Sequence, residues 1–288
     1  MTPPLRTTAL ALLLTALVAA SACAEPPASA GADGRADTPT DSGAIAAYDF
    51  ASPVATVNLA ADLMEISALS YRPDGRLAAV HDEEGILYTI EPSTGAIVGQ
   101  RRFAGAGDFE GVEWAEGGTW VLRSNGSLHV VPDSGGVVEE FNTPLRANCD
   151  AEGLAYDTMG RALLIACKEQ PGQGLEGTRA VYAFDLRTRT LGESPVLLID
   201  RRQVDAAGQF KPSALAIHPT TRQVYIVSSV RKAIVVLEPN GTFVSLTELP
   251  SELYSQPEGL AFAPDGTLYI SNEGVGGSAT LLRFDPRP

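Results

Sequence analysis

A short phrase that opens an apolar strand occurs five times in this chain and constrains the fold more than any other feature. It is a glutamate or serine, then glycine or alanine, then leucine or valine, and the copies lie at 66–71, 109–114, 151–156, 212–217 and 257–262. Successive copies are 43, 42, 61 and 45 residues apart. A period of roughly 40–45 residues, in units that contain several short strands, is typical of a β-propeller.

The segments between the phrases read as further strands joined by tight turns. Pro73-Asp74-Gly75 and Pro264-Asp265-Gly266 separate apolar runs, and this turn chemistry favours hairpins. The last copy is followed by only two more strands, whereas residues 48–59 form a strand-like segment before the first copy. We expect that segment to complete the last blade and close the ring, which removes an exposed sheet edge. The predicted fold is an all-β, five-bladed propeller of four-stranded antiparallel blades over residues 45–288.

The N-terminal region has the pattern of an export signal. Arg6 precedes an apolar run of twelve residues, 9–20, which is shorter than the roughly 20 residues that span a bilayer. Cys23 follows Ala20-Ser21-Ala22, a sequence that resembles the lipobox at which bacterial lipoproteins are lipid-modified. The alternative is cleavage by an ordinary signal peptidase, which leaves Cys23 as a free thiol. We therefore predict a signal peptide of lipoprotein type over 1–22.

Residues 23–44 are rich in Ala, Pro, Gly, Ser and Asp and show no apolar period, so they are interpreted as a disordered tether. The whole N-terminal pattern predicts an exported, membrane-anchored lipoprotein of the cell envelope, on the periplasmic or outer-membrane side. The lipid anchor would be its only attachment to the membrane.

The charge balance restricts the partners. A formal net charge of −14 argues against nucleic acid, because binding to phosphates requires a basic face, and against docking on anionic lipid. An acidic surface fits either an ordinary soluble domain or one that concentrates cations. We expect a monomer whose unidentified ligand or envelope partner binds at the mouth of the central channel.

Two cysteines remain if Cys23 carries lipid. An exported protein with an even pair favours a disulfide. A turn at 157–160 would place Tyr156 opposite about Ala162, and Cys149 nearly opposite Cys167 on the adjacent strand. The spacing predicts a Cys149–Cys167 disulfide; the alternative is two buried thiols.

Three of the phrases carry a glutamate at the same position: Glu110, Glu152 and Glu258. In a closed ring they would point toward one mouth of the channel. Three carboxylates in a partly desolvated space repel one another and shift toward protonation, and a bound cation removes that difficulty. Oxygen donors without a Cys or His cluster favour Ca²⁺ over zinc or copper.

The ends of the second strands reach the same mouth, so Asp82 and Glu273 join the predicted metal ligands. Lys168 also ends a second strand and would compete with a metal for the carboxylates. The alternative is that the glutamates only cap the strand starts or pair with Arg and Lys.

The phrases and their neighbours also point to a known family. The relevant segments, in order, are 65–69, 108–111, 148–156, 168–169 and 256–261, and the most specific is Asn-Cys-Asp-Ala-Glu-Gly-Leu-Ala-Tyr at 148–156. With these segments the chain resembles the SdiA-regulated family of bacterial envelope propellers, distant relatives of NHL-repeat proteins, over about residues 47–286. The resemblance implies a five-bladed propeller with a calcium site and implies no established activity.

Catalytic motifs are scarce. The chain has no Gly-x-Ser-x-Gly elbow, no His-Glu-x-x-His and no phosphate-binding glycine loop, so no catalytic residue is assigned. The favoured function is a calcium-binding lipoprotein that acts as a binding or scaffold module. The alternative is a calcium-dependent hydrolase of lactonase or phosphoesterase type at the channel mouth, for which His81 or Glu273 would be the candidate base.

Overall fold

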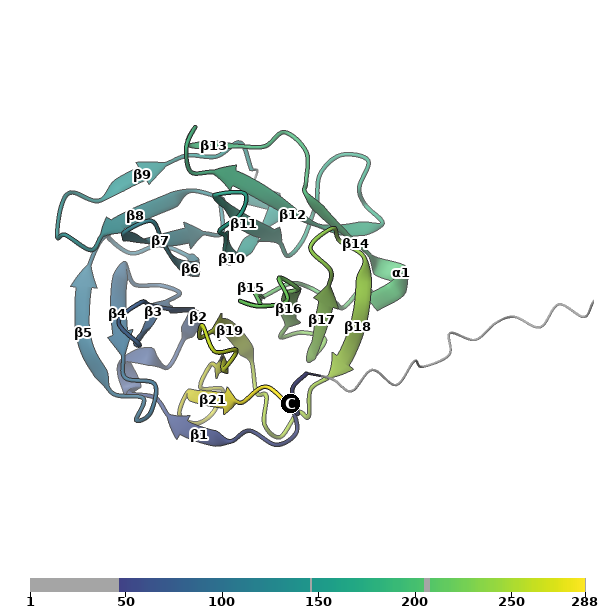
Figure 1. Ribbon diagram of the computed structural model, residues 1–288. Coiled ribbons are helices and arrows are strands. Elements are labelled where there is room, and N and C mark those ends of the chain that lie inside the picture. Colours follow the sequence, from purple (N-terminus) through teal and green to yellow (C-terminus); the bar gives the residue numbers. More distant parts are fainter. Residues whose placement is uncertain (1–46, 146, 205–207, 288) are drawn as a thin grey trace, which may run out of the picture. The chain divides into compact units, whose positions relative to one another are not determined.

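Each copy of the repeated phrase begins the innermost strand of an antiparallel sheet. The computed structural model describes residues 47–145, 147–204 and 208–287, so the predicted signal peptide, the tether and Cys23 lie outside the described residues. Five sheets surround a common centre (Figure 1), and their innermost strands contact one another in cyclic order. This confirms the predicted five-bladed, all-β propeller.

The strands follow the repeats, and the helices are short. The first two blades consist of β2 (Ile66–Tyr71), β3 (Leu77–His81), β4 (Ile86–Ile90) and β5 (Ile97–Arg102), then β6 (Phe109–Ala115), β7 (Gly118–Arg123), β8 (Leu128–Pro132) and β9 (Glu139–Phe141). The third consists of β10 (Ala151–Asp157), β11 (Ala162–Cys167), β12 (Thr178–Asp185), β13 (Thr190–Leu191) and β14 (Leu197–Asp200). The fourth consists of β15 (Ala214–Ile217), β16 (Val224–Ser228), β17 (Ala233–Leu237) and β18 (Phe243–Glu248). The fifth consists of β19 (Pro257–Phe262), β20 (Leu268–Asn272), β21 (Thr280–Phe284) and β1 (Ala55–Asn58).

The helical elements among the described residues are η1 (Ala61–Leu63), η2 (Ala147–Cys149) and α1 (Arg201–Val204). Within the described part of the chain, no helix has the length and apolar character needed to cross a membrane.

The two ends of the domain close the ring as predicted. Strand β1 pairs antiparallel with β21, with Ala55 opposite Arg283 (Figure 1). The residues just before β1 are anchored as well, because the buried Tyr48 donates a hydrogen bond to the Gly266 carbonyl at 2.6 Å. The last blade is thereby built from both chain ends, and β1 pairs with the outer edge of β21.

The third blade departs from four continuous strands. Its third strand, β12, is eight residues long, and its outer edge pairs with β13 at one end and with β14 at the other. Neither of these strands is long enough to cover β12 alone. The outer position is therefore shared by two short strands, and the extra residues occupy the long third interval.

The hydrophobic core lies between neighbouring blades. The five clusters of buried side chains each join two adjacent sheets. The second strands are covered on both faces, and all six residues of β11 are buried. Such strands are continuously apolar because both of their faces pack against neighbours.

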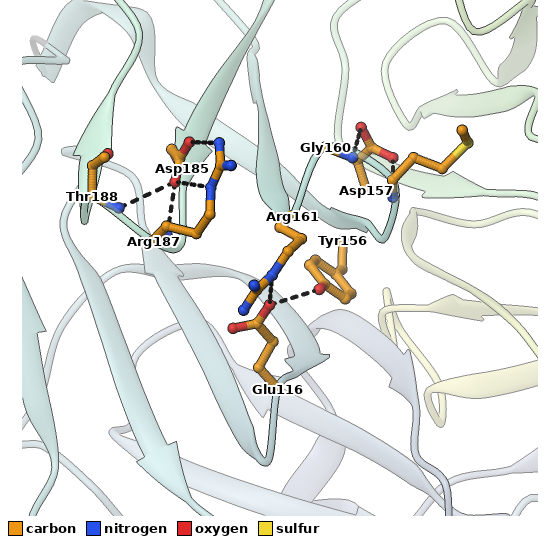
Figure 2. Close-up of polar contacts among 9 residues, drawn as sticks. Glu116, Tyr156, Asp157, Gly160, Arg161, Asp185, Arg187 and Thr188 are labelled. Atoms are coloured by element: carbon orange, nitrogen blue, oxygen red, sulfur yellow. Dashed lines mark hydrogen bonds and ion pairs between the residues drawn. The ribbon is translucent and has the colours of Figure 1, made fainter.

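The hairpin turns on the face opposite the phrase starts are linked by surface polar contacts. Arg161 Nε lies 2.8 Å from a carboxylate oxygen of Glu116, and the Tyr156 hydroxyl donates to the same oxygen at 3.0 Å (Figure 2). These contacts join the second and third blades. Because both ionic partners are largely exposed, they contribute little to stability.

Candidate functional site

Four of the five phrases contain a β-bulge at their second residue. The pairing register shifts at Ser67, Glu110, Glu152 and Glu258, so that each is an extra residue between two paired ones. A bulge turns the side chain of the extra residue away from the regular alternation. The repeated bulge therefore sets these side chains apart from those that pack between blades.

The glycine after each glutamate is required by close packing at the axis. A Cβ on Gly153 would lie 2.4 Å from Leu215 Cδ2 of the next blade, and one on Gly111 would lie 2.8 Å from Leu154 Cβ. These distances are shorter than real Cβ contacts. In each Glu-Gly pair, the glutamate is set out of the regular alternation by the bulge. The glycine allows the inner strands to pack closely.

The serine phrases have a structural role that the sequence did not reveal. The Ser67 hydroxyl donates to the Phe109 carbonyl at 2.6 Å, and the Ser213 hydroxyl donates to the Pro257 carbonyl at 2.8 Å. Each accepting carbonyl belongs to the residue directly before a glutamate of the next blade. The two serines therefore hold the strand starts that present Glu110 and Glu258.

The three glutamates lie in a strongly desolvated environment. Glu152 and Glu258 are 4% and 7% exposed. Burial, together with the Glu152 and Asp108 carboxylates, raises the pKa of Glu110 to about 10. Burial also raises the pKa of Glu258, against the opposing effect of Lys168. Like charges in a site of low dielectric cannot all ionise without a counter-ion.

Lys168 is the counter-ion beside Glu152. Its ammonium group donates a hydrogen bond to the Glu152 carboxylate. Burial still raises the pKa of Glu152 to about 8, although Lys168 acts in the opposite direction. One ammonium group therefore offsets only part of the repulsion. Lys168 and Glu152 thus form a buried ion pair.

The other two predicted ligands are Glu273 and Asp82, at the ends of second strands. Burial, Glu258 and Asp82 raise the pKa of Glu273 to about 8, and the Gln256 amide donates to its carboxylate. Asp82 lies beside His81, with 3.1 Å between His81 Nδ1 and Asp82 Oδ1. We call Glu110, Glu152, Glu258, Glu273 and Asp82, with the adjoining Asp108 and Asp150, the acidic mouth.

The structure does not bring all predicted ligands into one tight set. Among the described residues, the acidic and histidine side chains whose candidate ligand atoms all lie within 4.8 Å are Glu65, His81 and Asp82. The carboxylates of Glu110, Glu152 and Glu258 form no such group.

Sequence reasoning missed part of the acidic mouth. Every copy of the phrase has a polar residue two positions before its glutamate or serine: Glu65, Asp108, Asp150, Lys211 and Gln256. This second position repeats as regularly as the phrase itself and was the signal that could have identified them.

Cys149 and Cys167 are joined by a disulfide with their Cα atoms 4.9 Å apart. The predicted register of this hairpin is wrong by one residue, because Tyr156 lies opposite Leu163 and Cys149 precedes β10 in η2. The crosslink joins the segment that leads into Glu152 to the strand end that carries Lys168. It therefore tethers the two partners of the buried ion pair.

A cavity of about 950 Å³ lies beside the disulfide on the third blade. Its lining includes both cysteines, Tyr182, Glu169 and Lys211. Lys211 pairs with Glu169, the residue that follows Lys168. The cavity is large enough for a small organic ligand, and its lining residues Cys149 and Glu169 are chain neighbours of Asp150 and Lys168.

Comparison with known proteins gives a family and a fold. The sequence model of the family described as SdiA-regulated matches residues 44–275. Glutaminyl cyclase from Myxococcus xanthus is 14% identical, with a TM-score of 0.57 over 82% of this chain and 97% of that one. A gluconolactonase from Xanthomonas campestris is 12% identical, with a TM-score of 0.51 over 76% and 72%.

A streptogramin B lyase is more distant. It is 13% identical with a TM-score of 0.46, and the match covers 77% of this chain and 65% of the lyase. At their low identities, the likenesses to the cyclase and the gluconolactonase show the propeller fold alone.

Proposed function

Because this chain belongs to the SdiA-regulated family, we propose that it is a calcium-binding β-propeller that acts as a binding or scaffold module of the cell envelope. The observation that carries the proposal is the set of three bulge-borne carboxylates, Glu110, Glu152 and Glu258, gathered at the inner strands with one lysine beside them.

The chemistry of these donors fits Ca²⁺. Ca²⁺ prefers six to eight oxygen ligands and accepts carboxylates, carbonyls and water in a flexible geometry. Glu110, Glu152 and Glu258 supply hard oxygens whose mutual repulsion a divalent cation would remove. Glu110, Glu152 and Glu258 would hold the cation, whose charge would replace that of the Lys168 ammonium beside Glu152. Glu273 and Asp82 would contribute negative charge from the rim.

The place of the protein in the cell rests on the sequence of residues 1–44. The apolar run and Cys23 support export and lipid anchoring. An unidentified small ligand or envelope partner would bind at the channel mouth, and the cavity on the third blade has room for a small organic group.

Calcium titration of the purified protein tests the proposal. Calorimetry and thermal melts in EDTA and in excess Ca²⁺ should show binding and a higher melting temperature. Glu152→Gln should weaken binding, whereas Glu116→Gln, which changes the same charge on the opposite face, should not. No calcium-dependent shift, or equal binding by Glu152→Gln, would refute the calcium site.

Hydrolysis is the other outcome to examine. A panel of lactones and phosphodiesters should give no turnover above that of the Glu152→Gln variant. Calcium-dependent turnover that this substitution abolishes would replace the binding module with a hydrolase.

A further inference from the structure

A second constellation lies at the edge of the first blade and shares only Asp82 with the acidic mouth. Glu65 directly precedes β2, His81 ends β3, and Asp82 follows it. We call these three residues the rim triad. The first blade carries Ser67 at its bulge instead of a glutamate, and the Ser67 hydroxyl is engaged with the second blade.

The backbone holds the rim triad in place. Ile66 lies opposite His81 in the ladder between β2 and β3. The Asp82 backbone N–H donates to the Glu65 carbonyl at 3.2 Å, which extends the pairing by one step. The three side chains therefore project from paired strand ends, and their positions do not depend on a loop.

The imidazole lies between two carboxylates. His81 Nε2 is 3.4 Å from a carboxylate oxygen of Glu65, and His81 Nδ1 is 3.1 Å from Asp82 Oδ1. One ligand atom from each residue lies within 4.8 Å of the other two. The exposed fraction of the side chain is 14% for His81, 32% for Asp82 and 51% for Glu65. The triad is therefore anchored on its inner side and open to solvent on its outer side.

The hydrogen bonds within the triad leave one acceptor unsatisfied. The Glu83 backbone N–H donates to His81 Nδ1 at 3.2 Å, so that the lone pair of this nitrogen is engaged. Asp82 Oδ1, at 3.1 Å from the same nitrogen, is inaccessible to solvent and has no hydrogen-bond donor. A buried carboxylate oxygen without a donor is unfavourable, and a cation bound by Asp82 would satisfy it. His81 would then ligate through Nε2, or through Nδ1 if the Glu83 N–H gives way.

We infer that Glu65, His81 and Asp82 form a second metal site, for a first-row transition-metal dication such as Zn²⁺, separate from the calcium position. An imidazole nitrogen is a ligand of Zn²⁺, Cu²⁺, Ni²⁺ and Fe²⁺, whereas Ca²⁺ takes oxygen. One nitrogen and two carboxylate oxygens give three protein ligands. A Zn²⁺ with three protein ligands keeps a position for water or an external ligand.

The test uses Co²⁺ and Zn²⁺ as probes on the purified protein in saturating Ca²⁺. Co²⁺ should produce visible absorption bands with a stoichiometry of one, and Zn²⁺ should displace it. His81→Gln and Asp82→Asn should weaken binding by more than about 100-fold, beyond the usual effect of residues outside the ligand shell. The matched control is Glu83→Gln, an exposed carboxylate at the same strand end, which should retain the site.

The two metal sites are distinguished by measuring the binding of each metal to each variant. Glu152→Gln should lose Ca²⁺ and keep Co²⁺, and His81→Gln should do the reverse. Near-ultraviolet circular dichroism of each variant without metal checks that it is folded. Absence of Co²⁺ binding in the wild type, or Co²⁺ binding that survives His81→Gln and disappears in Glu152→Gln, would overturn the inference. Neither result depends on whether the protein binds Ca²⁺.

Discussion

Replacing Glu110 by Gln should change how the stability of the metal-free protein depends on pH. In the folded protein, burial and the neighbouring carboxylates raise the pKa of Glu110 from 4.5 to about 10. The folded state therefore keeps a proton that the unfolded state releases above about pH 4.5. Since the folded state binds more protons, the free energy of unfolding falls as the pH rises between these two values.

The size of the effect follows from the same linkage. Each pH unit inside this window costs about 1.4 kcal/mol for one such group. Between pH 5.5 and 7.5 Glu110 should thus remove about 3 kcal/mol of stability. Glutamine has the shape of the protonated acid and cannot ionise, so Glu110→Gln should remove this part of the slope.

In the matched control residue, Glu116, the pKa is shifted in the opposite direction. Glu116 is exposed, and its pKa is lowered by its hydrogen bond with Arg161 (Figure 2). A carboxyl group whose pKa is lowered by folding adds stability at pH values above its ordinary pKa. This stability is lost as the pH falls. Glu116→Gln should therefore leave the slope between pH 5.5 and 7.5 unchanged and alter only the acidic limb.

Urea unfolding in EDTA at several pH values from 4 to 9 measures these slopes. The variants should be compared with the wild type, first without metal and then with excess Ca²⁺. By the proposal, Ca²⁺ should flatten the wild-type profile, because it binds the deprotonated carboxylates. The reasoning would be refuted if the free energy of unfolding depended equally on pH in the wild type and in Glu110→Gln. It would also be refuted if Glu116→Gln reduced this pH dependence as much as Glu110→Gln does.

Three further changes test other parts of the molecule. Gly153→Ala should lower the free energy of unfolding by about 1–3 kcal/mol, through overpacking against Leu215, as read from urea denaturation; an unchanged midpoint would contradict the close approach. Lys168→Met should raise calcium affinity at least about tenfold, by removing a competing cation, and should lower stability in EDTA by about 3 kcal/mol; calorimetry that shows weaker binding would exclude the competition. Cys23→Ser should abolish labelling by radioactive palmitate in cells, and a label that persists would rule out this anchor.

The number of blades and their closure could be predicted because their signals are local. Each phrase, turn and apolar run is a property of one or two strands, and copies of the phrase can be counted without knowing what they touch. The split outer strand of the third blade could not be predicted in this way. Both β13 and β14 are short, and only the length of β12 decides that they share its edge.

The candidate site could be predicted only in part. Equivalent positions in the repeat identified Glu110, Glu152 and Glu258. Their geometry depends on bulges, and an extra residue in one strand cannot be read from the alternation of apolar residues alone. The neighbouring Glu65 and Asp108 were missed, although every copy of the phrase has a polar residue at that position.

The sequence by itself determined the repeat, the ring of five blades and the end of the propeller at which the glutamates gather, because these follow from the order of short-range patterns. Only the tertiary structure decided which side chains meet. The bond from Ser67 to Phe109, the contact of Gly153 with Leu215 and the rim triad each depend on strand register and on packing at strand ends or between blades. The first two contacts join residues 42 and 62 positions apart in the chain, and the distances in all three follow from the folded backbone.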